Sequence, residues 1–392
     1  MKKTNLLNKK ENIKKSDNFK NYILPYHFLP KYHQYVLHKN DTIPDLKDIE
    51  FELNKNTFTS EFSILKKLDD KFQDNTNKFV ELEDKIGDKS TKLLEEYFDN
   101  LSFYNFTKNN KIGPWVNKKY NIPYKGWTNA WRKIYEIVNN LDLIKTNAKK
   151  KTFHHFDICG YPGAFIFAVF HYLETKTAYS KYDWYVQSYN ETPGKKPTYL
   201  KDSYNLQKKY EDRFLFGSEK TDYSGDITEK DNIKEYAKFF ENKKNDLVTS
   251  DCGLAIDFEK SYLREFQMSQ IHFGQFICGL MCIKKGGSFV MKNYRQSSPF
   301  SISIIYLMTL VFKKTYLIKP ESSRQFGNEI YLVGKSYYDN LNSEHFKQLL
   351  KIISKSNFKD QKLLNKIIVP NKHIKKQKLE KIIEQCYKYF NK

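Results

Sequence analysis

Residues 153–165 place a short apolar segment, a glycine turn and the start of a second apolar segment in direct succession. The first segment ends at Asp157, and the second runs from Ala164 to Leu173. The turn between them contains Gly160, Pro162 and Gly163. This order predicts a strand, a tight turn and a helix. An α/β sheet uses such a turn to bring backbone N–H groups close to a nucleotide-like ligand.

The same turn has a second interpretation, in which no ligand binds and glycine only permits a positive φ. The turn lacks the G-x-G-x-x-G pattern of dinucleotide-binding proteins, and it also lacks the Lys-[Ser/Thr] pair of a P-loop. Taken alone, the turn therefore leaves both interpretations open.

Strand and helix patterns alternate from about residue 113 to residue 338. Alternation predicts an α/β fold with a mostly parallel, seven-stranded sheet and helices on both faces. We expect the last strand to pair antiparallel, because only a short loop precedes it. The expected strands are 153–158, 184–189, 213–217, 246–250, 287–292, 314–319 and 328–334. The expected helices are 128–140, 164–174, 231–242, 259–283 and 299–312.

Two extensions flank this predicted domain. Residues 1–112 form a Lys/Asn-rich, partly helical region, with helical patterns at 62–68 and 91–98 and expected disorder up to about residue 20. Residues 339–392 form a basic helical extension, in which 13 lysines and 5 acidic residues give 13 − 5 = +8. We expect its apolar helical face to pack on the domain. That face comprises Ile374, Leu379, Ile382, Ile383, Cys386 and Phe390.

The net charge favours a polyanionic partner. The chain has 67 basic and 46 acidic residues, a formal charge of +21, for which nucleic acid is the usual partner. A/T-rich codon usage would also enrich lysine, so the charge supports an RNA or DNA partner without establishing one. The basic N-terminus precedes no apolar segment of a secretion signal, and the longest apolar run, 299–312, is too short to span a bilayer.

The five cysteines have no framework spacing, and their odd number suggests a reducing compartment. Cys278 and Cys282 lie four residues apart on an apolar helix. Without a second ligand pair nearby, this spacing favours core packing over zinc binding.

Chemistry in an open α/β sheet takes place beyond the carboxyl ends of the strands. Asp157, Asp251 and Lys292 are expected there, and an antiparallel last strand would bring Glu329 to the same edge. Lys133 lies on the helix before the first strand. Lys292 follows a strongly apolar strand and has a second cation within reach, both of which should lower its pKa and let it accept a proton. His154 and His155 begin a strand, away from this edge, and are interpreted as structural.

The chain resembles the FtsJ-like ribose 2′-O-methyltransferases, and within them the Adrift-type branch of viral and related proteins that methylate mRNA caps. The resemblance covers about 128–337 and rests on motifs in a fixed order. They are Thr128-Asn-Ala-Trp-Arg-Lys133-Ile-Tyr-Glu-Ile, Asp157-Ile-Cys-Gly-Tyr-Pro-Gly-Ala-Phe, Gly225-Asp-Ile-Thr, Thr249-Ser-Asp-Cys-Gly, Val290-Met-Lys-Asn-Tyr, and Lys319-Pro-Glu-Ser-Ser-Arg324 followed by Asn328-Glu-Ile-Tyr-Leu-Val.

The resemblance implies a Rossmann-like methyltransferase fold and a catalytic tetrad of Lys133, Asp251, Lys292 and Glu329. Lys292 would be the general base on a ribose 2′-OH, and the other three would tune its pKa and steer the hydroxyl. The methyl donor would be S-adenosyl-L-methionine, and the scheme requires no metal. The implied acceptor is the first transcribed nucleotide of capped mRNA.

The resemblance also implies binding residues. Those expected along the cofactor are Asp157, Gly160, Pro162, Gly163, Phe165, Asp226 and Asp251, with Asp226 at the adenine amino group. Arg295, Ser323 and Arg324 are candidate RNA contacts, although a surface-loop arginine needs no ligand. The turn departs from the family by reading Pro-Gly-Ala-Phe, and no residue of the 190–212 insert can be assigned to the cofactor ribose.

Two alternatives remain open. One keeps the chemistry but directs it to ribosomal or transfer RNA, and the other is a catalytically silent RNA-binding or scaffold subunit. A small-molecule methyltransferase would leave the charge and the two lysines unexplained. Capping or transcription proteins are further expected partners. The resemblance implies a cytoplasmic site of action, in a viral factory or a virion, without a membrane.

Overall fold

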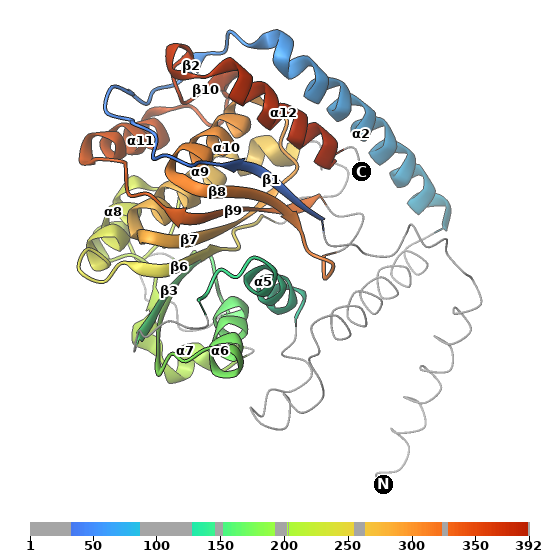
Figure 1. Cartoon of the computed structure of the whole chain (residues 1–392). Coiled ribbons are helices and arrows are strands. Elements are labelled where there is room, and N and C mark those ends of the chain that lie inside the picture. Colours follow the sequence, from blue (N-terminus) through green and yellow to red (C-terminus); the bar gives the residue numbers. More distant parts are fainter. Residues whose placement is uncertain are drawn as a thin grey trace.

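The computed structural model describes residues 33–86, 128–145, 152–192, 202, 204–254, 263–323 and 328–390. Its centre is an eight-stranded sheet in the order β1-β8-β9-β7-β6-β3-β4-β5 (Figure 1). The strands are β1 His33–Lys39, β3 Thr152–Ile158, β4 Lys181–Gln187, β5 Phe214–Leu215, β6 Asn245–Ser250, β7 Ile283–Tyr294, β8 Phe312–Lys319 and β9 Glu329–Tyr337. A separate two-stranded sheet pairs β2 Asn54–Lys55 with β10 Lys366–Ile367.

The strand directions follow the predicted plan. Strands β3 to β7 run parallel to one another, and β9 lies antiparallel between β7 and β8. All seven predicted strands form, and the antiparallel pairing of the last one is confirmed. The eighth strand, β1, pairs antiparallel with β8 and was not predicted. Its sequence gives little signal, because only three of its seven residues are large and apolar or aromatic (Tyr35, Val36 and Leu37).

Helices cover both faces of the sheet. On β6, Leu247 and Val248 point to opposite faces, as neighbouring residues of a strand must, and they belong to two different core clusters. The helices are α2 Thr59–Ile86, α5 Asn129–Asn140, α6 Ala164–Lys176, α7 Leu206–Lys209, α8 Lys230–Phe239, α9 Arg264–Cys282, α10 Pro299–Val311, α11 Ser343–Lys355 and α12 Lys376–Phe390. The Leu247 face packs against α5 and α6, and the Val248 face packs against α8 to α12.

Helix α5 begins at a side-chain cap, with the Thr128 hydroxyl accepting a hydrogen bond from the Trp131 N–H at 3.3 Å. Trp131 and Tyr135 are stacked on its buried face, with ring centroids 5.2 Å apart. This face packs against α6. The packing fixes the rotation of α5 and therefore the direction in which Lys133 extends.

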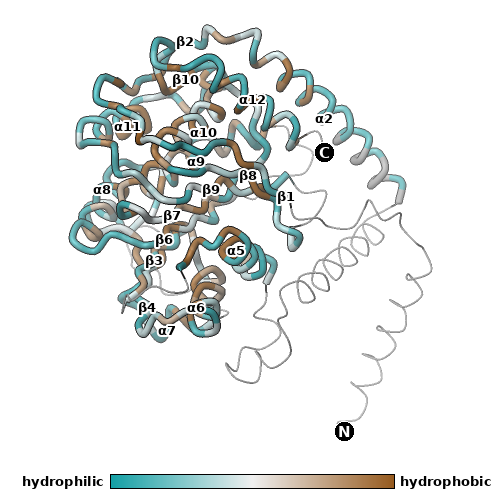
Figure 2. Tube along the Cα trace, viewed as in Figure 1, coloured by the Kyte–Doolittle hydropathy of each residue, from teal (hydrophilic) through white to brown (hydrophobic). Residues whose placement is uncertain are grey.

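The basic C-terminal extension forms α11 and α12, as predicted. Its apolar face is buried, apart from a partly buried Phe390. Helix α12 lies beside α2, where Lys376 pairs with Glu61 at 3.0 Å (Figure 1). Figure 2 shows hydrophilic residues dominating along these two helices, while apolar residues concentrate around the sheet. The predicted helical pattern at 62–68 lies in α2, whereas 91–98 and the first 20 residues lie outside the described ranges.

The strongly apolar run near residue 300 forms α10, which is only 13 residues long and almost entirely buried. Within the described ranges, no helix has the length and apolar character needed to cross a membrane. Cys278 and Cys282 are buried in α9, in agreement with the predicted core packing.

Candidate active site

The glycine turn joins β3 to α6 at the carboxyl edge of the sheet. Gly163 has a φ of +104°, which a glycine adopts readily. A Cβ on Gly160 would lie 2.1 Å from Asp157 Oδ2, so the turn closes directly over this carboxylate. No side chain caps the start of α6. Its first N–H groups can therefore bind a polar ligand.

Asp157 lies at the end of a buried polar chain. The Thr249 hydroxyl donates to its Oδ1 at 2.6 Å, and the same hydroxyl lies 2.7 Å from His155 Nε2. The Tyr182 hydroxyl holds His155 Nδ1 at 2.6 Å. Burial, with a smaller contribution from the Asp251 charge, raises the pKa of Asp157 well above its ordinary value. His155 thus has a structural environment, while Asp157 Oδ2 is buried and has no hydrogen-bond partner among the described residues.

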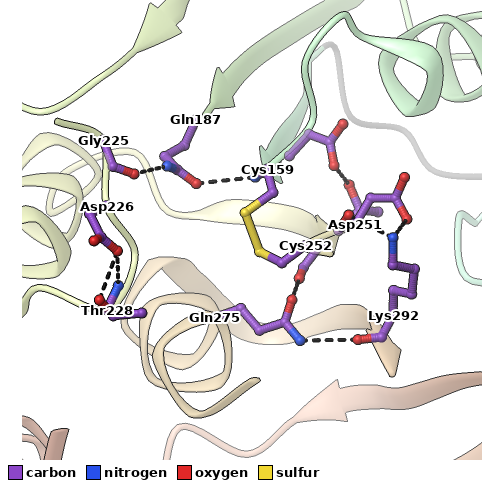
Figure 3. The surroundings of a disulfide bond; sticks show 12 residues. Cys159, Gln187, Gly225, Asp226, Thr228, Asp251, Cys252, Gln275 and Lys292 are labelled. Atoms are coloured by element: carbon purple, nitrogen blue, oxygen red, sulfur yellow. Dashed lines mark hydrogen bonds and ion pairs between the residues drawn. A yellow bond between two sulfur atoms is a disulfide. The ribbon is translucent and has the colours of Figure 1, made fainter. Parts of the chain in front are cut away.

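Gln187, at the end of β4, ties the glycine turn to the loop that carries Asp226 (Figure 3). Its Oε1 accepts from the Cys159 N–H at 3.1 Å, and its Nε2 donates to the Gly225 carbonyl at 2.5 Å. Asp226 Oδ1 accepts from both the N–H and the hydroxyl of Thr228, at 2.8 Å each. Gln187 could not be predicted as a site residue, because a glutamine at a strand end has no sequence pattern of its own.

A disulfide joins Cys159 in the turn to Cys252, which directly follows Asp251 (Figure 3). The two residues are 93 positions apart in sequence. They meet because β3 and β6 are parallel neighbours, with Ile158 opposite Ser250. The bond contrasts with the reducing compartment that the cysteine count suggests, since spacing along the chain does not reveal neighbouring strand ends.

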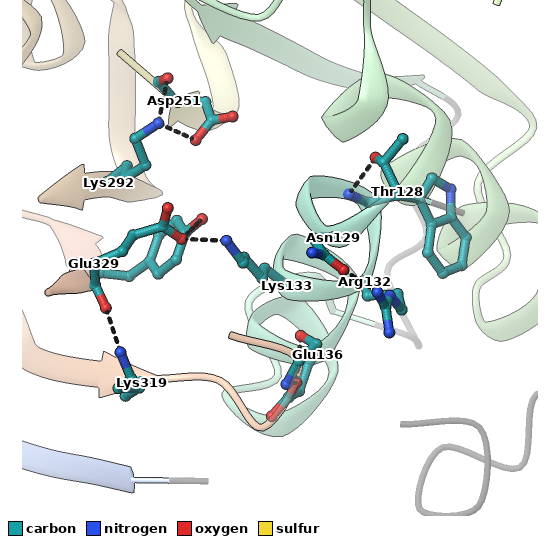
Figure 4. A network of polar contacts seen from close by, with 12 residues as sticks. Thr128, Asn129, Arg132, Lys133, Glu136, Asp251, Lys292, Lys319 and Glu329 are labelled. Atoms are coloured by element: carbon teal, nitrogen blue, oxygen red, sulfur yellow. Dashed lines mark hydrogen bonds and ion pairs between the residues drawn. The ribbon is translucent and has the colours of Figure 1, made fainter. Parts of the chain in front are cut away.

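The four predicted catalytic residues come together as two ion pairs at this edge (Figure 4). Lys292 Nζ lies 3.0 Å from Asp251 Oδ1 and donates to the Asp251 carbonyl at 2.9 Å. Lys133 Nζ, from α5, lies 2.5 Å from Glu329 Oε1. The antiparallel register places Tyr294, two residues after Lys292, opposite Glu329. The predicted tetrad is therefore a spatial cluster drawn from α5, β7, β9 and the segment after β6.

The prediction of a lowered pKa for Lys292 is wrong. Burial alone would lower it, but the charge of Asp251, with further contributions from Tyr294 and Glu329, outweighs burial and raises the pKa above its ordinary value. For Glu329, burial is likewise outweighed, by Lys133 and Lys292, so its pKa is lowered. The sequence revealed the two lysines but not the direct contact that keeps Lys292 protonated.

A third lysine borders the cluster. Lys319, at the end of β8, is 9% exposed and donates to the Glu329 carbonyl at 3.1 Å (Figure 4). Burial lowers the pKa of Lys319 to about 8, with an opposing contribution from Glu329 and a supporting one from Lys133. Lys319 begins the motif Lys319-Pro-Glu-Ser-Ser-Arg324, but the motif alone predicted no role for it.

The remaining residues predicted to contact the cofactor or RNA differ in how accessible they are to a ligand. The Phe165 side chain is buried among residues of α5 and α6, so a ligand could meet only its backbone. Arg295 pairs with Asp69 of α2 at 2.5 Å, and a phosphate would compete with that carboxylate. Ser323 is 1% exposed, and Arg324 lies outside the described residues. Pro162 is partly exposed within the turn.

The turn, the strand ends and the two ion pairs all lie in a part of the chain that matches a known protein family. The FtsJ-like methyltransferase family model matches residues 127–337, more than half of the chain. The chain belongs to the FtsJ-like methyltransferases. The predicted family resemblance and the Rossmann-like methyltransferase fold are therefore confirmed.

Relatives of this FtsJ-like methyltransferase include viral proteins. An uncharacterised protein of Acanthamoeba polyphaga mimivirus is 36% identical over 239 residues, which is 60% of this chain and 28% of that protein. A probable methyltransferase of African swine fever virus is 31% identical over 230 residues, covering 56% of this chain and 52% of that protein. The chain thus spans about half, or less, of these relatives.

A cap-specific mRNA (nucleoside-2′-O-)-methyltransferase 2 of Danio rerio is 29% identical over 215 residues, 54% of this chain and 28% of that protein. Among solved structures, an S-adenosylmethionine-dependent methyltransferase from Clostridium acetobutylicum aligns at 12% identity and a TM-score of 0.24. That alignment covers 62% of this chain and 87% of the other. At this TM-score, the similarity supports no conclusion about the fold or the function of this chain.

Proposed function

We propose that this FtsJ-like methyltransferase transfers a methyl group from S-adenosyl-L-methionine to an RNA ribose 2′-OH, that of the first transcribed nucleotide of capped mRNA. The observation that carries the proposal is the pairing of Lys292 with Asp251 and of Lys133 with Glu329 beside the glycine turn. The basic chain and the cap-specific relative support RNA as the acceptor.

The residues of the turn fit the methyl donor. Because Gly160 has no side chain, the turn can lie directly against Asp157, whose buried Oδ2 has no hydrogen-bond partner among the described residues. The uncapped start of α6 offers N–H groups. Asp226, held at the same edge by Gln187 and Gly225, would accept from the adenine amino group. When bound, the donor would supply a methyl group carried on a positively charged sulfur, and the ribose oxygen would bond to the carbon of that methyl group as the carbon–sulfur bond breaks.

Lys292 would accept the hydroxyl proton. In the ion pair with Asp251 its ammonium is favoured, so it must first lose a proton to solvent. Lys292 would lose that proton more easily beside the positively charged sulfur of a bound donor, because a neighbouring positive charge disfavours the ammonium. Asp251 then stabilises the ammonium that forms again when Lys292 takes the ribose proton. Lys133 and Glu329 would orient the hydroxyl, so catalysis is positioning together with deprotonation.

The test is methyl transfer from labelled S-adenosylmethionine to a short capped RNA. Lys292→Ala should lower the rate by about 10²–10⁴-fold, the usual contribution of a general base. Lys238→Ala is the matched control, since Lys238 is exposed on α8. Full activity of Lys292→Ala would refute the role of the lysine.

Comparing different RNAs as methyl acceptors distinguishes the cap target from the alternative functions. A preference for capped over uncapped RNA supports the cap target, whereas equal use, or preference for ribosomal or transfer RNA, redirects the proposal to those substrates. A chain that methylates no RNA and does not bind the cofactor in a titration would be the catalytically silent subunit.

A further inference from the structure

Lys319 is the last residue of β8, and its ammonium reaches the first residue of β9. The side chain is buried, and its Nζ donates to the Glu329 carbonyl at 3.1 Å (Figure 4). The carboxylate of the same glutamate pairs with Lys133 at 2.5 Å. Glu329 is therefore held at its backbone by one lysine and at its side chain by another.

The Glu329 carbonyl faces β8. Backbone carbonyls along an antiparallel strand point alternately to its two neighbours. The Arg295 N–H, at the end of β7, donates to the Asn328 carbonyl at 3.0 Å. Since the Asn328 carbonyl points to the β7 side, the next carbonyl, that of Glu329, points to the β8 side. A regular ladder would pair it with a backbone N–H of β8.

The residue of the β8 segment that falls opposite Glu329 cannot supply that N–H. Ile318 lies opposite Tyr331, and the same register carried two residues further places Pro320 opposite Glu329. A proline has no backbone N–H to donate. The Lys319 ammonium therefore takes the place of the backbone donor that the ladder lacks at this point.

An ammonium is an unfavourable choice for this position. Burial lowers the pKa of Lys319 to about 8, and Glu329 opposes this effect while the charge of Lys133 supports it. An uncharged side chain of similar length would fill the same space without the loss of hydration. The lysine is therefore better explained by its effect on Glu329 than by the stability of the fold.

The charge of Lys319 also acts on the Glu329 carboxyl group. Burial would raise the pKa of Glu329, but Lys133 and Lys292, with a smaller contribution from Lys319, lower it. Lys319 thus affects Glu329 in two ways. It fixes the backbone from which the side chain extends, and it favours the ionised carboxylate that pairs with Lys133.

We propose that Lys319 is a positioning residue that fixes the Glu329 backbone and thereby keeps the Lys133–Glu329 ion pair in place at the active site. The inference rests on the proposed function, in which this pair orients the ribose hydroxyl, and it adds a third lysine that acts through Glu329. Three strands, β9, β7 and β6, separate β8 from β3, which carries the glycine turn. Loss of Lys319 should therefore impair methyl transfer and leave cofactor binding intact.

The first measurement needs no activity. The Glu329 carboxyl is titrated by ¹³C NMR in the full chain with labelled glutamate, and Glu329→Gln identifies its signal. Lys319→Met should raise the pKa of Glu329, because a positive charge beside the carboxylate is lost. Lys313→Met, an exposed lysine on the same strand, should leave that pKa unchanged. An unchanged pKa of Glu329 in Lys319→Met would overturn the proposal.

The second measurement is methyl transfer from labelled S-adenosylmethionine to a short capped RNA. Lys319→Met should lower kcat about ten-fold, the loss expected for a hydrogen bond from a charged group. The KM for RNA and the cofactor affinity should stay within about two-fold, and Lys313→Met should match the wild type. An unchanged kcat, or a loss confined to KM or to cofactor affinity, contradicts the positioning role.

A rescue variant separates the hydrogen bond from simple space filling. Pro320→Ala returns a backbone N–H opposite the Glu329 carbonyl, so in the Lys319→Met background it should recover part of kcat. No recovery would refute the hydrogen bond as the contribution of the lysine. If Lys319→Met does not fold, Lys319→Gln replaces it and should also raise the pKa of Glu329, since an amide carries no charge.

Failure of the proposed function is distinguishable from failure of this inference. If the wild type methylates no RNA, the proposed function fails by itself, and the Glu329 titration still tests Lys319. A raised pKa of Glu329 in Lys319→Met then supports the contact, and an unchanged pKa refutes it.

Discussion

Burial and ion pairing act in opposite directions on Lys292. Burial favours the neutral amine, but Asp251, Tyr294 and Glu329 favour the ammonium and raise the pKa. The lysine is therefore held ready as an ammonium and becomes a base only when its proton leaves. Methyl transfer should accordingly increase with pH.

Asp251→Asn should move that pH dependence. Removing the carboxylate removes the largest effect that raises the pKa of Lys292, so the rising limb of kcat against pH should shift to lower pH. The rate at the plateau should fall, because Asp251 also orients the amine. The measurement is a pH–rate profile at saturating cofactor and RNA. A shift to higher pH would contradict the assignment of Lys292 as the base.

Glu136 should make the stability of the protein depend on pH. Its buried carboxylate, on α5, accepts hydrogen bonds from Glu321 and Ser322, yet burial raises its pKa from the ordinary 4.5 to about 7 in the folded chain. Between these values the folded state binds more protons than the unfolded state, so the free energy of unfolding falls as the pH rises. The loss is on the order of 3 kcal/mol by pH 8.

Chemical unfolding of wild type and Glu136→Gln at pH 5 and pH 8 measures this contribution. The wild type should lose stability relative to the variant as the pH rises, because glutamine does not titrate. The opposite trend would show that the hydrogen bonds to Glu321 and Ser322 outweigh burial.

At the scale of elements, the β3–α6 turn depends on the absence of one side chain. A Cβ at Gly160 would meet the Asp157 carboxylate at 2.1 Å, and that carboxylate is fixed from below by Thr249. Gly160→Ala should lower cofactor affinity at least ten-fold and destabilise the fold by about 1–3 kcal/mol. Calorimetric titration and thermal unfolding check the two effects, with the exposed Lys238→Ala on α8 as control. Unchanged affinity would place the cofactor elsewhere.

The Cys159–Cys252 bond connects two neighbouring parallel strands, β3 and β6, beside the site. It closes a segment of 93 positions, so its removal should cost about 2–4 kcal/mol of stability. Cys252→Ser should unfold at a lower temperature than the oxidised wild type, and a reductant should bring the wild type to the same value. A melting temperature of the wild type that does not respond to the reductant would show that the bond contributes nothing.

At the scale of the whole molecule, local signals predicted most of the fold. Each buried parallel strand carries its own apolar run, and α5, α6, α8, α9 and α10 carry helical periodicity, so the type and order of these elements could be read from the chain. The four-residue α7 was not predicted, because it is too short to show a helical period. Strand β1 could not, because its pairing with β8 depends on a segment about 280 residues away. The Cys159–Cys252 bond and the Arg295–Asp69 pair escaped prediction for the same reason.

The candidate site divides in the same way. Asp251, Lys292 and Glu329 were found because strand ends converge on one edge, a consequence of topology alone. Glu136 and Lys319 were not given a role, because their importance depends on which loop atoms they reach. The predicted direction of the pKa shift of Lys292 was wrong, because the order of residues along the chain does not give the distance between Lys292 and Asp251. Sequence thus identified the elements that build the site, and the structure added the contacts that decide charge.

We propose that this FtsJ-like methyltransferase methylates a ribose 2′-oxygen of capped RNA. The most direct test is mass spectrometry of a capped RNA after incubation with the protein and S-adenosylmethionine, followed by nuclease digestion. We predict one added methyl group on the ribose of the first transcribed nucleotide, absent with Lys292→Ala. A methyl group on a base, or unmodified RNA from a protein that binds the cofactor, would contradict the account.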